Sequence, residues 1–222
     1  MHIENHLHLY RTEVLETCAD KPVDMLELAT SVQSEWIFME AATNLLGRSN
    51  CDFDKAQPKL VELGISDLFN RKRKDFKDQL RECEYELLIM QMDLTESHSF
   101  NEQGGLNFFR QWLSERLFFG YGSGLRQGYA YIYRTIAERK LSTKVDEHNE
   151  RMTEYLETMK RDGANVEAFA ADEVNPMFDE AADLIAPLMK DVTRRQDKTV
   201  DVFRPLTFMG VSDDELPWVK KA

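Results

Sequence analysis

The sequence predicts an all-α fold: an irregular multi-helix bundle with an extended, apolar-rich C-terminal tail. Apolar residues recur at spacings of three and four along most of the chain, which is the period of a helix with one buried face. Glycine (10) and proline (6) are scarce in 222 residues, whereas sheet proteins need many turn residues. We therefore expect about six to eight helices around a core.

Apolar periodicity and punctuating residues divide the first part of the chain into four helices. Proline fits the first turn of a helix and glycine its end, so Pro22 begins the second helix and Gly47 is a natural C-cap for it. The expected helices are His2–Ala19, Pro22–Leu46, Phe53–Leu63 with Gly64 after it, and one from Ser66 or Asp67 to about Leu94.

The middle of the chain is the most loop-like at Thr95–Gly105, where serines, an asparagine and two glycines gather. After it we expect helices Phe108–Phe119 and Leu125–Lys140, joined by a turn at Gly120–Gly124. A further helix runs from Ser142 or Thr143 to about Asp162, followed by a turn at Gly163–Asn165 and a short helical segment Val166–Ala171. The last expected helix runs from Asn175 to about Gln196, and Pro187 kinks it. A strand at GYAYIY is the alternative for part of this region, but it would lack partner strands.

The domain organisation follows from these elements. Residues 1–199 form the helical domain, and residues 200–222 form the tail, where prolines and a glycine interrupt the helical pattern. If the helical domain is divided, we expect the division near 95–105.

Charge and cysteine content narrow the classes of function. The formal net charge of −12 argues against binding of nucleic acid or an anionic membrane by the bulk surface. The three cysteines are far apart and form no CxxC pair, which is typical of a reducing compartment. With no apolar stretch long enough to span a membrane, the sequence predicts a soluble cytoplasmic protein.

The tail is the strongest functional candidate. Its large apolar residues are too many for an idle linker and too irregular for a helix, so we expect the tail to lie in a groove. The groove belongs either to its own chain or to another subunit or partner protein. We expect a non-enzymatic protein that acts through protein–protein interaction, as an adaptor, assembly factor or inhibitor, with no catalytic residue and no cofactor assigned. The candidate partner-binding residues are Phe203, Leu206, Phe208, Met209, Leu216 and Trp218.

Two acidic pairs carry an enzymatic alternative. Glu154 and Glu157 lie three residues apart, as do Glu180 and Asp183, and pairs at this spacing share a helix face and can hold Mg²⁺. This ExxE…ExxD arrangement resembles the all-α nucleoside-triphosphate pyrophosphohydrolases. The resemblance implies that the four carboxylates bind Mg²⁺, which would hold the triphosphate and activate water. Solvated acidic helix faces are the simpler alternative.

A second alternative is a bundle that binds a planar or aromatic ligand at the glycine- and tyrosine-rich segment. Glycines allow close approach of a ligand, and tyrosines offer flat faces. A packed aromatic core with a glycine turn explains the same residues. The candidate pocket residues are Phe119, Tyr121, Gly122, Gly124, Tyr129 and Tyr133.

One dense basic run, Arg71–Lys74 with Lys77, stands out in an acidic chain. On a helix these residues wrap around the axis. We interpret the run as a solvated helix end, with local docking of an acidic partner or an RNA phosphate as the alternative.

Overall fold

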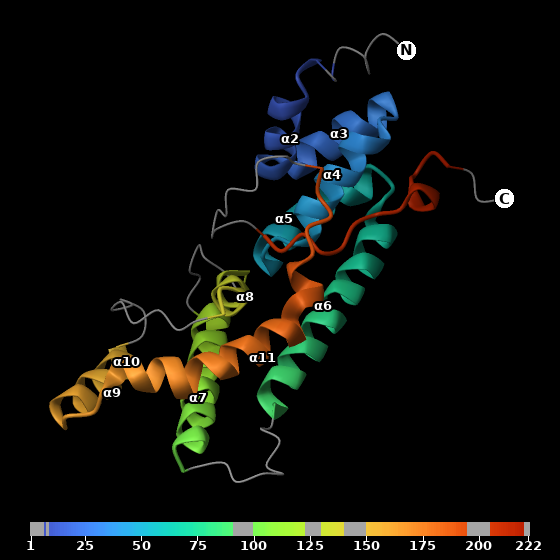
Figure 1. Ribbon diagram of the computed structural model, residues 1–222. Coiled ribbons are helices and arrows are strands. Elements are labelled where there is room, and N and C mark those ends of the chain that lie inside the picture. The colour runs from blue at the N-terminus through green and yellow to red at the C-terminus, as the bar shows by residue number, and fades with distance from the viewer. Residues whose placement is uncertain are drawn as a thin grey trace. The chain divides into compact units, whose positions relative to one another are not determined.

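A computed structural model of the chain describes residues 7, 9–90, 100–122, 130–139, 150–194 and 205–219 (Figure 1). Within these residues the regular structure is helical and contains no strand, which confirms the all-α prediction. The chain divides into two compact units. Unit 1 comprises Met1–Arg81 together with Leu188–Ala222, and unit 2 comprises Glu82–Pro187. The separate prediction of a division near 95–105 stays a prediction.

In unit 1, residues 22–46 form two helices where the sequence predicts one. The expected helix Pro22–Leu46 is wrong, because Gln33 has a left-handed backbone (φ 53°) and the buried Ser34 follows it. The resulting helices pack on one another, so the two apolar faces read from the sequence belong to separate helices. The helices of unit 1 are α2 (Arg11–Asp20), α3 (Pro22–Val32), α4 (Glu35–Leu46), α5 (Asn50–Glu62) and the first part of α6 (Ser66–Ile89).

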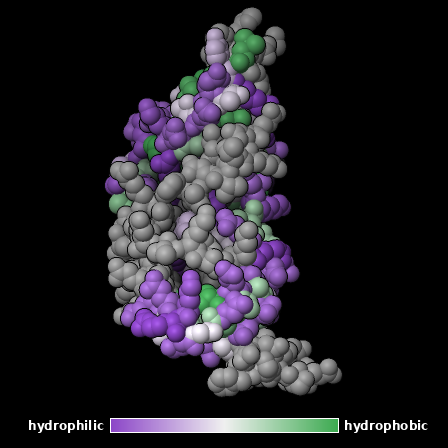
Figure 2. Space-filling view, turned by 60° about the vertical axis from the view of Figure 1, so that its left-hand side comes forward, coloured by the Kyte–Doolittle hydropathy of each residue, from purple (hydrophilic) through white to green (hydrophobic). Residues whose placement is uncertain are grey.

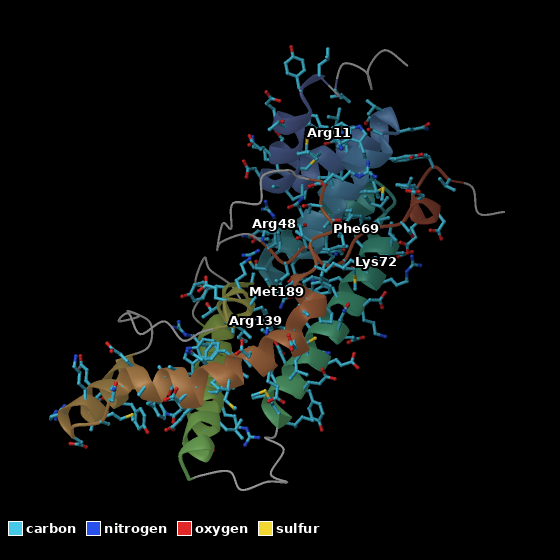
Figure 3. All side chains as sticks on the ribbon, viewed as in Figure 1. Arg11, Arg48, Phe69, Lys72, Arg139 and Met189 are labelled. Carbon is cyan, nitrogen blue, oxygen red and sulfur yellow. The ribbon has the colours of Figure 1, made fainter. Side chains whose placement is uncertain are left out.

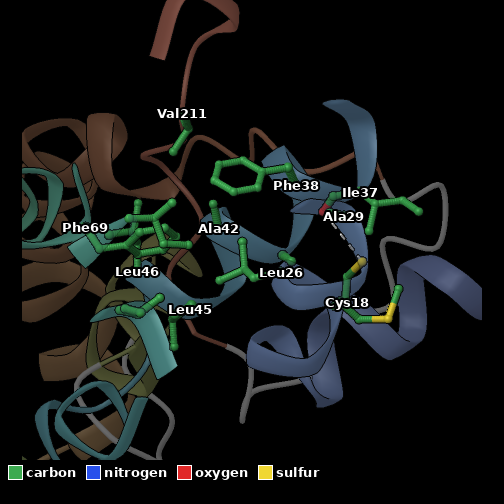
Figure 4. Packing of buried hydrophobic residues seen from close by; sticks show 14 of the residues in the cluster. Cys18, Leu26, Ala29, Ile37, Phe38, Ala42, Leu45, Leu46, Phe69 and Val211 are labelled. Atoms are coloured by element: carbon green, nitrogen blue, oxygen red, sulfur yellow. Dashed lines mark hydrogen bonds between the residues drawn. The ribbon is translucent and has the colours of Figure 1, made fainter. Parts of the chain in front are cut away.

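The core of unit 1 lies around α4, whose residues are buried on almost every side. Figure 4 shows Leu26, Ile37 and Phe38 packed together, with Val211 of the tail beside Phe38. The thiol of Cys18 is buried in the same core and donates to the carbonyl of Ile37 (3.9 Å). The tail therefore contributes to this core instead of only lying over it.

Unit 2 contains the end of α6 and the helices that follow. They are α7 (Phe100–Gly122), α8 (Ala130–Ala137), α9 (Glu150–Arg161), α10 (Val166–Phe169), a π-helical turn Ala170–Val174 and α11 (Asn175–Ile185). A 3₁₀ turn Ala186–Met189 follows, and unit 1 resumes within it at Leu188. The expected last helix to Gln196 is too long, because Lys190–Arg194 is not helical. Gly163 has a positive φ of 84° and Asn165 caps α10, as expected for a turn at this point.

Helix α7 corrects two expectations. It begins at Phe100, so the loop expected at Thr95–Gly105 is wrong from Phe100 onward, and it continues through Gly122, where a turn was expected. Gly105 faces the backbone of Glu173, and a side chain on Gly105 would overlap the Glu173 carbonyl oxygen. The glycine therefore serves close helix packing. Residues 130–137 are helical, which rules out the strand alternative for this part.

Aromatic side chains form the core of unit 2. Phe109 of α7 meets Phe178 of α11 edge to face, with ring centroids 5.1 Å apart, and Trp112 lies 4.9 Å from the same ring. Tyr133 of α8 is fully buried, and its hydroxyl donates to Glu84 Oε1 (2.7 Å). These described aromatics of the 108–140 stretch are core residues.

The surface is mainly hydrophilic where it is described. On the face drawn in Figure 2, hydrophobic residues appear as separate spots among hydrophilic ones. No helix in the described part of the chain combines the length and the apolar character needed to cross a membrane.

Candidate functional site

Residues 205–219 of the tail lie on unit 1 as a mostly non-helical segment with one 3₁₀ turn at Asp213–Glu215. The backbone N–H of Val192 donates to the carbonyl of Thr207 (3.0 Å). The Thr207 hydroxyl donates to Asp191 Oδ1 (2.9 Å), and the same carboxylate accepts from Thr193. Hydrogen bonds to the 191–193 segment therefore hold the start of the described tail.

Apolar contacts hold the same part of the tail more tightly. The ring of Phe208 stacks on Phe76 of α6, with centroids 4.5 Å apart. Leu206 is buried, and its carbonyl reaches Gly47 so closely that a methyl group on Gly47 would overlap it. Gly47 has an ordinary φ of −80°, so here glycine is needed for the approach of the tail and not for a left-handed cap.

The later part of the tail packs on α4. Trp218 meets Phe38 edge to face, with centroids 5.5 Å apart. Val211 and Leu216 are buried in the core of unit 1. Buried apolar side chains are thus spread along the described tail from Leu206 to Leu216.

A charged contact anchors the 3₁₀ turn. Glu215 accepts from Arg71 Nη2 at 2.9 Å and pairs with Lys72 Nζ at 2.6 Å, and both cations lie on α6; Figure 3 labels Lys72. Ser212 completes a capping box with the same carboxylate. Burial alone would raise the pKa of Glu215, but the hydrogen bonds from Lys72 and Ser212 outweigh it and lower the pKa to about 2.

A buried carboxylate lies beneath this region. Glu40 of α4 is 3% exposed, and its Oε2 accepts the backbone N–H of Arg194 at 2.8 Å. Burial raises the pKa of Glu40, although the bond from Arg194 opposes the change. Glu40 also lines a cavity of about 260 Å³ with Lys72 and Gly210. Through its bond to Arg194, Glu40 connects the segment after α11 to α4, the helix on which the tail packs.

The basic run on α6 is structural for its first three residues. Arg71 and Lys72 hold Glu215, as described above. Arg73 is buried, donates to the carbonyls of Leu46 and Arg48 at the end of α4, and lies over the rings of Phe53 and Phe76. Cations at the C-terminus of a helix stabilise its dipole. The interpretation as solvated residues is therefore wrong for Lys72 and Arg73, whereas Arg71 is exposed despite its ion pair.

The structure places the predicted partner-binding residues within their own chain. Leu206, Phe208 and Leu216 are buried, and Met209 and Trp218 are half-buried. These contacts are made within one chain, and the alternative in which the tail lies on another subunit or a partner protein stays a prediction. The sixth residue, Phe203, lies outside the described residues.

The four carboxylates of the enzymatic alternative are exposed on α9 and α11. Arg139 Nη2 donates to Asp183 Oδ1 (2.5 Å), and Arg139 also lies 3.6 Å from Asp179 (Figure 3 labels Arg139). Among the described residues, no three histidine, cysteine or acidic side chains gather into a group that could hold a metal. The structure therefore does not bring Glu154, Glu157, Glu180 and Asp183 together.

The structure describes the six candidate pocket residues to different extents. Tyr133 is buried and bonded to Glu84, as given above. Phe119, Tyr121 and Gly122 belong to the last turns of α7, where only the backbone is described, and Gly124 and Tyr129 lie outside the described residues.

Comparison with known proteins adds no family to this description: no family model, no curated protein and no solved structure matches the chain. Sequence reasoning did not predict the close approach of the tail at Gly47, the buried carboxylate of Glu40 or the burial of Arg73. The signal for Arg73 was a cation on the apolar face of α6, between Phe69 and Phe76 at spacings of four and three.

Proposed function

We propose that the protein acts without catalysis, through protein–protein interaction, and that unit 1 recognises an extended peptide segment. Its own residues 205–219 supply such a segment in cis. A partner segment of similar character would compete for the same surface, as expected of an adaptor, assembly factor or inhibitor. One observation carries the proposal: the tail contacts α4 and α6 mainly through its side chains and not through regular backbone pairing.

The physical support is the kind of contact involved. Proteins that recognise extended peptides bury alternate side chains and fix the register with a few polar groups. Leu206 and Phe208 are buried, whereas Pro205 before them and Thr207 between them are half-buried. Glu215 supplies the charged group that fixes the tail to α6. A cytoplasmic location is part of the proposal, and the three free thiols, Cys18, Cys51 and Cys83, support it.

A competition experiment tests the proposal. The chain shortened by Val200–Ala222 is mixed with a fluorescein-labelled peptide of residues 205–219, and binding is followed by fluorescence anisotropy. We expect the shortened chain to bind the peptide and the full chain to bind it more weakly, because the attached tail occupies the surface. A matched peptide with Phe208→Ala and Glu215→Lys should bind at least tenfold more weakly, which corresponds to about 1.4 kcal/mol.

Two results would overturn the proposal. One is a shortened chain that keeps its helical circular dichroism but does not bind the peptide. The other is equal binding of the two peptides. If the shortened chain does not fold, the full chain carrying Phe208→Ala and Glu215→Lys replaces it. This variant should bind the unaltered peptide more tightly than the unaltered chain does, and equal or weaker binding contradicts the proposal.

A further inference from the structure

A cationic groove lies between α5 and α6 in unit 1, apart from the tail residues. Its volume is about 460 Å³, larger than the 260 Å³ of the cavity at Glu40. The lining residues are Phe53, Asp54, Gln57, Asn70, Arg73, Lys74, Lys77, Asp78 and Arg81. Four of these side chains are cations and two are acids, in a chain whose formal net charge is −12. The groove is thus a local reversal of the overall charge.

Three of the four cations of this groove, Lys74, Lys77 and Arg81, are available to a ligand. Lys74 is exposed and Lys77 half-buried, and neither forms an ion pair with another described residue. Arg81 pairs only loosely with Asp78, at 3.6 Å, and both side chains are mostly exposed. This contrasts with Arg71 and Lys72 on the same helix, which are occupied by Glu215.

A buried donor adds a second, independent observation. Arg73 is 4% exposed, and its two terminal nitrogens donate to carbonyls at the end of α4 and to Asn50. Its Nε–H is buried and has no hydrogen-bond partner among the described residues. Buried polar groups without a partner are uncommon in folded proteins, so this N–H calls for an explanation, and an acceptor brought by a ligand is one.

The spacing of the cations selects the kind of anion. Lys74, Lys77 and Arg81 succeed one another along one side of α6, and seven residues of helix cover about 10 Å. A single phosphate or carboxylate can reach only one or two of these groups. An extended peptide places side chains of one face about 6.7 Å apart, so two or three carboxylates on alternate residues span the row.

We propose that the α5–α6 groove is a docking surface for an acidic peptide segment of a partner protein, with carboxylates on alternate residues. Lys74, Lys77 and Arg81 bind the carboxylates, and a carboxylate that enters the groove supplies an acceptor near Arg73. Gln57 Nε2 donates to Asn70 Oδ1 (3.0 Å), so Gln57 Oε1 and Asn70 Nδ2 are the amide atoms left for the peptide backbone. Because α6 holds the tail on one side and this groove on another, the chain has two separate contact surfaces. This inference does not rest on the proposed role of the tail.

The test measures binding of an acidic peptide to the full chain. A fluorescein-labelled ten-residue peptide of alternating glutamate and serine is titrated with protein, and anisotropy is followed at about 25 mM and about 150 mM salt. Screening weakens contacts between exposed charges, so we expect tighter binding at the lower salt concentration. The double variant Lys74→Glu/Lys77→Glu should lose at least tenfold in affinity.

A control variant separates the groove from the total charge. Lys55→Glu/Lys160→Glu changes the net charge by the same amount, with both residues exposed and outside the groove, and it should bind the peptide within about twofold of the unaltered chain. Three results would each overturn the proposal: no binding at the lower salt concentration, equal loss in both double variants, or displacement of the peptide by inorganic pyrophosphate at equal concentration. The last would instead make the groove a polyphosphate site.

Discussion

Replacing two neighbouring glycines of α7 by alanine should have opposite effects on stability. At Gly104 a methyl group would lie 3.6 Å from Glu173 Oε2 and 3.9 Å from Phe169 Cε2, which are ordinary contacts. At Gly105 it would stand 2.6 Å from the Glu173 carbonyl carbon and overlap the carbonyl oxygen. The obstacle at Gly105 is backbone in the π-helical turn, so it cannot move aside as a flexible side chain can.

The magnitudes follow from two opposing terms. Alanine in place of glycine inside a helix stabilises by about 1 kcal/mol, and this is the whole effect expected for Gly104→Ala. Overpacking a close contact costs about 1–3 kcal/mol or more, so Gly105→Ala should lower the free energy of unfolding despite the same helical gain. Because the helical gain is the same at both positions, we expect the two variants to differ by the overpacking cost, about 1–3 kcal/mol.

Urea unfolding measures this difference. In a background with Trp36→Phe and Trp218→Phe, the fluorescence of Trp112 reports on unit 2 alone, because Trp112 packs against Phe178. Equal midpoints for the Gly104 and Gly105 variants would refute the reasoning, since they would mean that α7 does not approach the turn closely. A Gly104→Ala variant that is the less stable of the two would refute it as well.

Two further predictions concern unit 1 and the thiols. Because the folded pKa of Glu215 is lowered to about 2, its contribution is present above pH 4.5 and is lost as the pH falls toward 2; Glu215→Gln should flatten this part of the stability profile in acid urea titrations. One thiol, Cys51, should react quickly with a disulfide reagent, because Cys18 and Cys83 are buried and burial raises their pKa values. A fast reaction that survives Cys51→Ser contradicts this.

The sequence by itself determined the fold class and several boundaries. Pro22 begins α3, Gly64 follows α5 with a positive φ of 70°, and a turn lies at Gly163–Asn165, all as expected; the side chain of Asn165 also caps α10. These outcomes depend on local chemistry: the fixed φ of proline, the left-handed freedom of glycine and the side-chain acceptor of asparagine. Local chemistry is written in neighbouring residues, so a single sequence is enough to predict it.

Tertiary structure decided the features that involve residues far apart. No proline or glycine stands at Gln33, yet the helix breaks there because two apolar faces pack on each other. Gly105 has the appearance of a loop residue but lies in a helix, since its role is contact with Glu173, 68 positions later.

The tail likewise has some features that the sequence predicts and others that depend on distant residues. The sequence marks residues 200–222 as apolar and non-helical, but it does not say which surface receives them. That depended on Gly47 after α4 and on Phe76 and the Arg71–Lys72 pair of α6, which lie on two separate stretches of unit 1. A groove forms only when distant segments meet, so its shape and charge are properties of the folded chain.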